Sequence, residues 1–381
     1  MSSSRDYDFV IVGAGTAGSV LASRLSEDPA VSVLLLEAGA EQPLDLMSVP
    51  AAWPALIGSS ADWGGLSTEQ GFTGTAIPLP RGRGLGGSSS INGMNFLRGH
   101  RSSYDRWPEQ GAKGWGYDDL LPFFKRSENA PGRDGAVRGT GGPLTLEPLA
   151  EPSPLITACI EAAVEAGHRR VTDVSAGLEI GFGRPDNNIV GGVRQSAADA
   201  YLRPYLDRPN LDVVSGALVR RLQITDGRCT GVEYTDGDRP VSVGCGREVV
   251  LCAGAIGSPQ LLMLSGIGPQ AHLREAGVTP VLDLPGVGAN LQDHPMSTLT
   301  YTAGRTVPVI PGNPPGEALG LLRTDPSLDL PDIQVIFLSG PLCAPSLTGP
   351  DEGYTIAFSL MNPQSRGTVR LAGPDADTPP L

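Results

Sequence analysis

The chain of 381 residues has little of several features that mark common classes of protein. Its 28 lysines and arginines are outnumbered by 41 aspartates and glutamates, so the net charge is −13. This charge argues against nucleic acid or an anionic membrane surface as a partner. No apolar run reaches the ~18 residues that a membrane helix needs. The N-terminus, MSSSRDYD, lacks the basic and apolar regions of a secretory signal, and we expect a cytoplasmic protein.

Cysteine and histidine are also scarce. The five cysteines include no CxxC pair, which favours reduced thiols over a disulfide framework. The four histidines (His100, His168, His272 and His294) lack the spacing of metal ligands, so we expect no metal site. Glycine (51) and proline (35) are abundant, and 40 % of the residues are apolar. This composition predicts a sizeable core with many turns and long loops.

The N-terminal forty residues carry a nucleotide-binding pattern. An apolar run ends in the loop 13–18 (GAGTAG), a helix of small residues follows, and a second apolar run ends at Glu37, 19 positions after Gly18. This order predicts a βαβ dinucleotide-binding unit. Gly13 allows the turn, Gly15 lets the backbone approach a pyrophosphate, and Gly18 lets the helix pack on the sheet. Glu37 can accept hydrogen bonds from ribose hydroxyls, and the motif leaves both NAD and FAD open.

The rest of the chain predicts mixed secondary structure. Residues 153–167 are typical of an amphipathic helix, and residues 257–265 predict a helix capped by Ser258. Residues 211–250 predict short strands joined by Asp-Gly turns, as a small antiparallel insertion that returns to the main sheet. Residues 296–381 alternate strand-like runs with proline-rich loops, as in an antiparallel sheet.

Four features then follow one another in a fixed order: VIVGAGTAG with Glu37, GRGLGGSSSINGMNF at 82–96, GAIGSPQLLMLSGIG at 254–268, and PGVGANLQDHP at 285–295. Together they closely resemble the glucose–methanol–choline (GMC) oxidoreductases, a family of FAD-dependent enzymes. The resemblance spans nearly the whole chain and favours FAD over NAD. It implies oxidation of a small-molecule alcohol at its CH–OH group, with hydride transfer to the flavin.

The chemistry of the second glycine-rich stretch agrees with a flavin nucleotide. Gly84, Gly86 and Gly87 let backbone N–H groups gather around an anion, and Arg83 can offset phosphate charge. The following serines and asparagines supply donors for the polar edge of a flat ring. The resemblance implies that FAD is held by Gly13, Gly15, Thr16, Ala17, Gly18, Glu37, Ala38, Trp63, Arg83, Gly86, Gly87, Ser88, Asn92, Gly93, Met94, Asn95, Val219, Asn290 and Asp293.

Three departures from the family qualify this expectation. Ile91 stands where some relatives carry a histidine that tethers the flavin, so we expect non-covalent FAD. Arg138 begins a turn that opens with histidine in the family, and the replaced histidine is interpreted as structural. Trp63 matches a family tryptophan near the cofactor, although a loop residue that fills the core is an equally good interpretation.

The catalytic base is the largest departure. Relatives carry an HPxGTxxMG stretch and a later His or Asn, whereas this sequence ends at GTVRLAGPDADTPPL, which resembles the segment just before them. No histidine lies beyond His294, so we expect the catalytic histidine beyond Leu381, in a missing segment or in a second polypeptide. His294 is a weak candidate, for which a structural hydrogen-bonding role is favoured. Without that segment, the chain is expected to expose apolar surface.

The predicted architecture is α/β with two domains. Residues 1–152 and 212–295 form a Rossmann-like FAD-binding domain with a mostly parallel sheet. Residues 153–211 and 296–381 form a substrate-binding domain of the α+β type with an antiparallel sheet. Two other functions stay open: a lyase or light-driven decarboxylase on the same scaffold, and a non-catalytic FAD-binding subunit.

Overall fold

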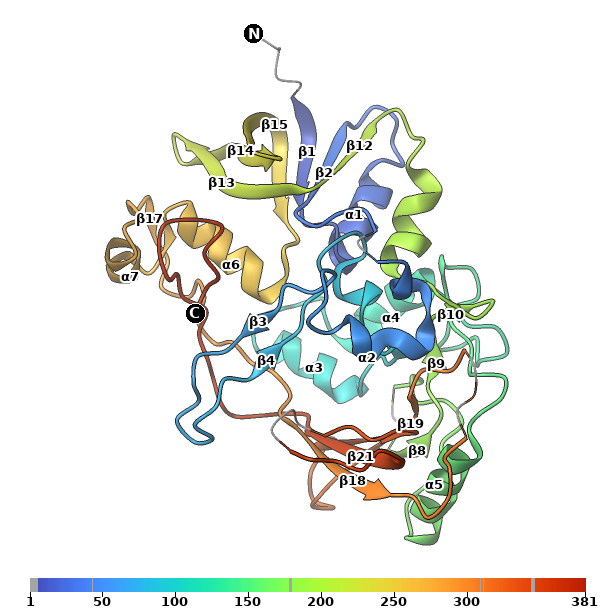
Figure 1. The fold of residues 1–381 in the computed structure, drawn as a ribbon. Coiled ribbons are helices and arrows are strands. Elements are labelled where there is room, and N and C mark those ends of the chain that lie inside the picture. The colour runs from blue at the N-terminus through green and yellow to red at the C-terminus, as the bar shows by residue number, and fades with distance from the viewer. Residues whose placement is uncertain (1–5, 43, 178–179, 309, 311, 344–346) are drawn as a thin grey trace.

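A computed structural model describes residues 6–42, 44–177, 180–308, 310, 312–343 and 347–381. Two sheets lie at opposite ends of the molecule, with short helices and long loops between them (Figure 1). The strands of both sheets come from distant parts of the sequence, so each sheet assembles only when the chain folds back on itself.

The first sheet has six strands in the order β12-β2-β1-β15-β14-β13. They are β12 (Leu211–Ser215), β2 (Val33–Glu37), β1 (Tyr7–Val12), β15 (Arg239–Leu251), β14 (Arg228–Asp236) and β13 (Ala217–Thr225). The four strands from β12 to β15 are parallel, and β13, β14 and β15 pair antiparallel. β2 is buried throughout, as its apolar run predicts for a strand covered on both faces. The predicted Rossmann-like, mostly parallel sheet with an antiparallel insertion is confirmed.

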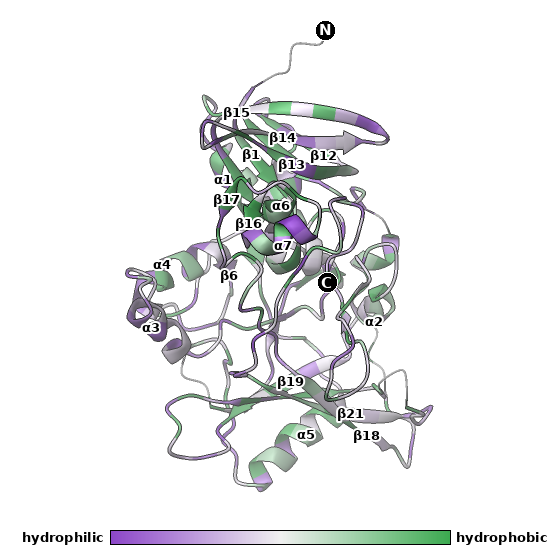
Figure 2. Ribbon diagram, turned by 90° about the vertical axis from the view of Figure 1, so that its left-hand side faces the viewer, coloured by the Kyte–Doolittle hydropathy of each residue, from purple (hydrophilic) through white to green (hydrophobic). Residues whose placement is uncertain are grey.

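Helices cover both faces of this sheet. Helix α1 (Thr16–Leu25) and the one-turn π-helix η4 (Ala198–Leu202) pack on one face with Ile11 and Leu35. Helix α6 (Gly254–Leu264) packs on the other face against β13. Hydrophobic residues concentrate where α1 and α6 meet the sheet (Figure 2). The helix predicted for 257–265 therefore starts earlier, because Gly254 (φ +76°) turns the chain directly out of β15, and Ser258 is not its cap.

The second sheet has five antiparallel strands in the order β18-β21-β20-β19-β8. They are β18 (Met296–Thr302), β21 (Gly353–Leu360), β20 (Ile333–Leu338), β19 (Gly316–Leu322) and β8 (Gly181–Gly183). Helix α5 (Pro154–Glu165), the amphipathic helix that the sequence predicts, packs Ile156 and Ile160 against Phe182 and Phe337 of this sheet. The predicted antiparallel sheet is confirmed.

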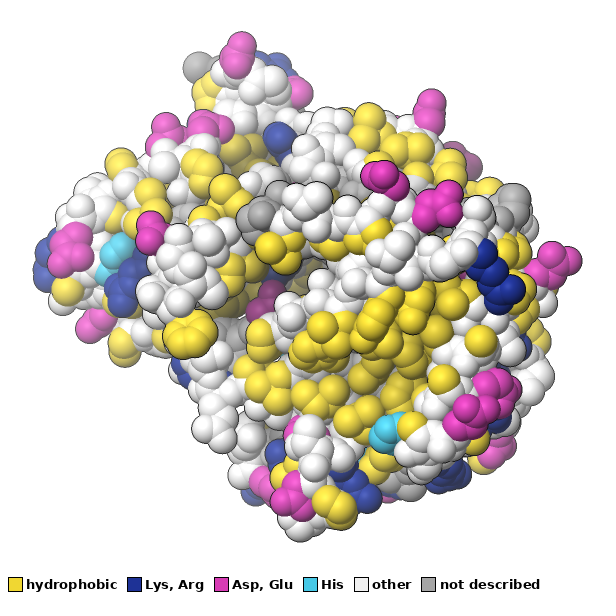
Figure 3. All heavy atoms as spheres, turned by 60° about the horizontal axis from the view of Figure 1, so that its bottom comes forward, with side chains coloured by type: hydrophobic (Ala, Val, Ile, Leu, Met, Phe, Trp, Pro, Cys, Tyr) yellow, Lys and Arg dark blue, Asp and Glu magenta, His cyan; other side chains and the backbone are white. Residues whose placement is uncertain are grey.

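Helix α5 covers only part of its face of the second sheet. Strand register places Leu299, Tyr301, Phe358 and Leu360 on the same face as Phe337, and all four are exposed. Figure 3 shows hydrophobic side chains gathered over this end of the molecule.

Shorter elements form the middle of the molecule. They are η1 (Asp45–Ser48), η2 (Pro50–Ala52), α2 (Trp53–Leu56), β3 (Gly65–Leu66), β4 (Pro78–Leu79), η3 (Gly87–Ser90), β5 (Asn95–Phe96), α3 (Arg101–Glu109), α4 (Tyr117–Ser127), β6 (Glu128–Asn129), β7 (Leu144–Thr145), β9 (Asp186–Asn187), β10 (Ile189–Val190), β11 (Val193–Arg194), η5 (Arg203–Tyr205), β16 (Ile267–Gly268), α7 (Gln270–Glu275) and β17 (Leu282–Asp283). Within the described ranges no helix could span a membrane and no cluster of His, Cys, Asp or Glu could hold a metal ion. All five cysteines are unpaired.

Candidate cofactor site

The two glycine-rich loops touch each other. The first loop, residues 13–18, joins β1 to α1, and the second contains η3. A Cβ atom on Gly87, whose φ is +52°, would lie 2.7 Å from the Cα atom of Gly15. Carbon atoms that are not bonded do not approach so closely, so only glycine fits at position 87. The backbones of the two loops therefore meet beside the start of α1.

Gly13 and Gly18 allow the close packing that the motif predicts. A Cβ atom on Gly18 would lie 1.9 Å from the carbonyl oxygen of Gly13, and Gly13 itself has φ +100°. The first turn of α1 has no side-chain cap and no acidic residue, and Thr16 and Ala17 are exposed. The unpaired N–H groups and the positive end of the helix dipole are thus open to an anion at this end.

Glu37 ties three backbone segments together. One carboxylate oxygen accepts a hydrogen bond from the N–H of Ala14 at 2.8 Å. The other accepts from Gly39 at 2.9 Å and from Gly84 in the second loop at 3.0 Å. Burial raises the pKa of Glu37, while these three N–H donors act in the opposite direction. The expected ribose acceptor therefore also joins the two loops, and its Oε2 atom, which accepts one of the three hydrogen bonds, keeps one lone pair for a ribose hydroxyl.

Trp63 lies at the surface, stacked against an arginine. The guanidinium of Arg83 is 4.8 Å from the centre of the Trp63 ring, and the tryptophan is 48 % exposed. The interpretation of Trp63 as a residue that fills the core is therefore wrong. Arg81 lies 3.8 Å from the carboxylate of Asp293, so the 285–295 loop reaches the Trp63 loop.

Asn92 follows η3 and is exposed. Its side-chain oxygen accepts hydrogen bonds from the N–H of Met94 at 3.1 Å and from Arg194 at 2.9 Å. Met94 is fully buried, and its backbone has a left-handed φ of +60°. The side-chain oxygen of Asn95 accepts from the amide of Asn187 at 2.8 Å.

Four other predicted residues surround the two loops. Gly86 packs so tightly that a Cβ atom would lie 2.3 Å from the Oγ of Ser90. Ser88 is exposed, and its Oγ accepts from Gly82. Gly93 packs near Trp53, and Ala38 is half-buried directly after β2.

Val219 and Asn290 lie further from the loop contact in the sequence. Val219 is buried on β13. Gly216, the residue before this strand, donates a backbone hydrogen bond to the carbonyl of Gly39. Asn290 is exposed at φ +59° and lines a pocket of about 320 Å³ between α6 and the 288–292 loop.

The histidines have mainly structural surroundings. His100 caps α3 by accepting from the N–H of Ser102, and burial lowers its pKa. The Nε2 atom of His272 accepts from the N–H of Leu371 at 2.9 Å. His168 packs its ring 5.2 Å from Phe182. His294 is exposed, and the structure gives its imidazole no defined role.

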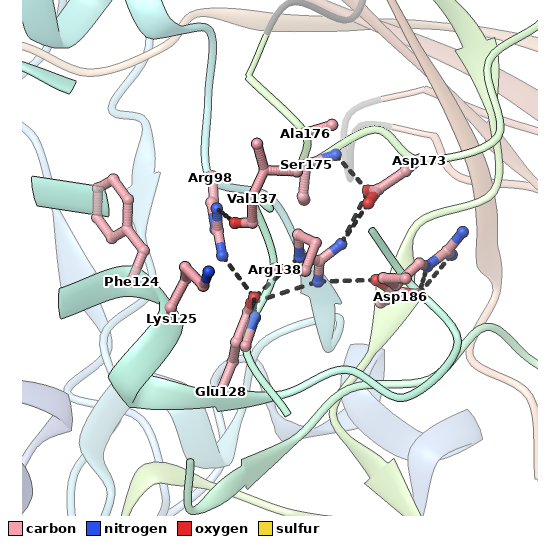
Figure 4. Close-up of polar contacts among 12 residues, drawn as sticks. Arg98, Phe124, Lys125, Glu128, Val137, Arg138, Asp173, Ser175, Ala176 and Asp186 are labelled. Atoms are coloured by element: carbon pink, nitrogen blue, oxygen red, sulfur yellow. Dashed lines mark hydrogen bonds and ion pairs between the residues drawn. The ribbon is translucent and has the colours of Figure 1, made fainter. Parts of the chain in front are cut away.

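The sequence did not predict a buried ion network next to β5 (Figure 4). Arg138 has a fully buried side chain and pairs with Glu128 at 2.9 Å, Asp173 at 2.8 Å and Asp186 at 2.9 Å. Arg98 also pairs with Glu128. Asp186 lies on β9, which pairs with β5, so the network fixes the segment that carries Asn95. The arginine that replaces the family histidine at position 138 is the centre of this network.

Comparison with known proteins identifies the class to which this fold and site belong. A sequence model described as GMC oxidoreductase matches residues 7–296. An oxygen-dependent choline dehydrogenase of Rhizobium etli is 42 % identical over 405 residues, which covers 98 % of this chain and 72 % of the relative. The crystal structure of pyridoxine 4-oxidase from Mesorbium loti is 39 % identical with a TM-score of 0.94, and the match covers 99 % of this chain and 75 % of that one. A formate oxidase structure is 26 % identical with a TM-score of 0.87, over 100 % and 77 % of the two chains.

These matches define a flavin-dependent oxidoreductase. The chain belongs to the GMC oxidoreductase family. It is an FAD-dependent enzyme that oxidises the CH–OH group of a small-molecule alcohol. The described residues fit this cofactor, because the Gly15–Gly87 contact leaves only backbone beside the uncapped start of α1.

Proposed function

We propose that the chain holds FAD non-covalently across the Gly15–Gly87 contact and oxidises an alcohol at the flavin. The observation that carries this proposal is the backbone contact itself, next to a helix start without a side-chain cap. FAD, when bound, supplies the acceptor for the hydride.

The residues around the contact have distinct tasks. The first turn of α1 and Arg83 bind the pyrophosphate, and Glu37 accepts hydrogen bonds from the ribose while it holds the loops together. Trp63, stacked on Arg83, borders the cofactor. The amide NH2 of Asn92 donates to the polar edge of the flavin ring. The other predicted cofactor residues named above form the cofactor site through their backbone or by close packing.

Ile91 supports non-covalent binding. Its side chain is 5 % exposed and packs with Met47, Leu56 and Ala61 in a hydrophobic cluster. An aliphatic side chain offers no nucleophile for a bond to the flavin.

The base that takes the hydroxyl proton is not one of the histidines with a structural hydrogen bond. His100 and His272 each already accept a hydrogen bond from a backbone N–H. His294 stays the weak candidate within this chain, and the catalytic histidine predicted beyond Leu381 stays a prediction. A second polypeptide has no support, because each relative carries the matching region within one longer chain.

The division into two domains is part of the proposal. Residues 1–152 and 212–295 supply the six-stranded sheet, apart from Leu211 at the start of β12, and the loops that meet at Gly15 and Gly87. Residues 153–211 and 296–381 supply the second sheet and α5, and we assign them to the alcohol substrate.

Anaerobic flavin reduction tests this proposal. The purified chain is loaded with FAD, freed of excess cofactor, and mixed without oxygen with choline, pyridoxine or benzyl alcohol. We expect a yellow protein that at least one alcohol bleaches, and acid precipitation that releases all flavin into the supernatant. Flavin that pellets with the protein would overturn non-covalent binding. Bound FAD that no alcohol reduces, also in a longer chain that includes the catalytic histidine predicted beyond Leu381, would favour the lyase, decarboxylase or non-catalytic alternative.

A further inference from the structure

One arginine beside the cofactor site is buried without an acidic partner. Arg194, at the end of the β10–β11 hairpin, is 4 % exposed. Its Nε donates to the carbonyl of Met47 at 2.7 Å, and its Nη1 donates to the carbonyls of Asn92 at 2.7 Å and Ser89 at 3.3 Å. Within the described part of the chain, no carboxylate lies within ion-pair distance of this guanidinium, and its Nη2 has no hydrogen-bond partner.

A buried cation without a counter-ion is costly to fold. Burial lowers the pKa of Arg194 to about 10, and the carboxylate of Asp199 acts in the opposite direction. The guanidinium therefore keeps its positive charge at neutral pH. Carbonyl oxygens accept hydrogen bonds from Nε and Nη1 of Arg194 but do not cancel its charge, so a role that uses the charge would account for an arginine at this position.

Arg194 also determines how the Asn92 amide is turned. The side-chain oxygen of Asn92 accepts from Nη1 of Arg194 at 2.9 Å and from the N–H of Met94 at 3.1 Å. Arginine and a backbone N–H can only donate, so this atom has to be the oxygen and not the NH2 group. The NH2 group must then point away from Arg194, and Asn92 as a whole is exposed.

We propose that Arg194 is a positioning residue for the flavin, which directs the Asn92 NH2 group to the polar edge of the ring and places a positive charge behind it. This inference rests on the proposed function, because it takes Asn92 as a flavin contact. The amide contributes affinity for FAD in both redox states. The positive charge of Arg194 favours reduced FAD, whose ring is more negative than that of oxidised FAD. It therefore raises the reduction potential of bound FAD.

Variants at position 194 separate these two effects. R194K keeps the charge but cannot bond to Met47 and Asn92 together, and R194M removes both charge and donors. N92L keeps the charge and removes the amide. R239M is the matched control, because the side chain of Arg239 is 74 % exposed and its ion pair within the described ranges is with Asp236, across the turn that joins β14 to β15. FAD affinity is measured by fluorescence titration, potential by equilibration with a reference dye, and folding by thermal unfolding without FAD.

We expect R194M to weaken FAD binding and to shift the equilibrium ratio of reduced to oxidised flavin by about tenfold towards the oxidised form. R194K should recover the potential more than the affinity, and N92L should lose affinity with little change in potential. R194M with the FAD affinity and potential of the wild type would overturn the inference. If R194M does not fold, R194K and N92L test the inference instead. The inference would be overturned if FAD affinity and reduction potential fell to the same extent in both variants. Failure of the wild type to bind FAD would instead overturn the proposed function.

Discussion

The Cα atom of Gly15 and the position of a Cβ atom on Gly87 are separated by 2.7 Å, although the two residues are 72 positions apart. This contact joins the loop after β1 to the loop that contains η3. It places the expected pyrophosphate site in one loop directly beside the expected flavin site in the other. A change at this contact should therefore act on FAD more strongly than on the fold.

Replacing Gly87 by alanine should greatly weaken FAD binding. The methyl group would overlap Gly15, and the backbone at φ +52° would be strained by about 1–2 kcal/mol. Gly132→Ala is the control, because Gly132 also has a positive φ of +78° but nothing within 4 Å of the added carbon. We expect a loss of FAD affinity of about 100-fold for the first variant, roughly 2.7 kcal/mol, and none for the second. Equal titration curves for both would contradict the role of the contact.

Replacing Glu37 by glutamine should destabilise both loops. The glutamine NH2 group would face at least one of the N–H donors of Ala14, Gly39 and Gly84, which leaves that donor unsatisfied at a cost of about 1–3 kcal/mol. Urea unfolding and FAD titration should both show the loss. Glu233→Gln, on the exposed side of β14, should change neither.

The pH dependence of this effect has a definite sign. Burial holds the pKa of Glu37 above its usual value in the folded chain. The stabilisation that comes from this pKa difference is therefore fully present below the pKa of Glu37 in the unfolded chain, and it is lost as pH rises through the pKa in the folded chain. The difference in stability between wild type and Glu37→Gln should change over that range, and a pH-independent difference would contradict the assignment.

The sequence predicts the parts of this molecule whose physics is local. The packing at Gly18 follows from Gly13, five positions earlier, and the apolar run at β2 already indicates that both faces of the strand are covered. The sequence pattern predicts a start for α6 that is three residues later than the observed Gly254, because a glycine with positive φ can begin a helix directly after a strand.

The long-range polar contacts could not be predicted in the same way. Arg194 bonds to Asn92 across 102 positions, and Arg138 meets Asp186 across 48. Any arginine in the sequence could pair with many carboxylates or carbonyls, and only the folded chain selects the partner. Trp63 shows the same limit, because its motif fits both a tryptophan near the cofactor and a loop residue that fills the core, and only its exposure of 48 % excludes the second.

His272 should make the chain sensitive to mild acid. Its Nε2 atom must be unprotonated to accept from Leu371, and burial together with Arg370 lowers its pKa, while Glu275 acts in the opposite direction. Because the pKa of His272 is lower in the folded chain than in the unfolded chain, His272 stabilises the fold at pH values above its unfolded pKa of about 6.5. This stabilisation is lost as pH falls through the pKa in the folded chain.

The contact between His272 and Leu371 holds residues 367–381 against α6 and α7. We therefore expect faster hydrogen exchange at the Leu371 amide and a lower unfolding temperature below about pH 6, near the unperturbed histidine pKa. The His272→Gln variant should have a lower unfolding temperature than the wild type at pH 7, and this temperature should not fall further as the pH is lowered below about 6. His294→Gln, at an exposed site, should keep the acid sensitivity of the wild type.

Removing Arg138 should be the most destabilising single change considered. Arg138→Met would leave Glu128, Asp173 and Asp186 without the guanidinium that joins them, and breaking a buried ion pair in this way costs about 3–5 kcal/mol. Because Asp186 lies on the strand that pairs with β5, the loss should extend to FAD affinity through Asn95. Arg366→Met is the control, since Arg366 is exposed and donates, among the residues that the structure describes, to the carbonyls of Pro363 and Ser365 close by in the sequence. Chemical unfolding followed by FAD titration of the folded fraction measures both effects, and a variant that loses stability but binds FAD like the wild type would limit the network to a purely structural role.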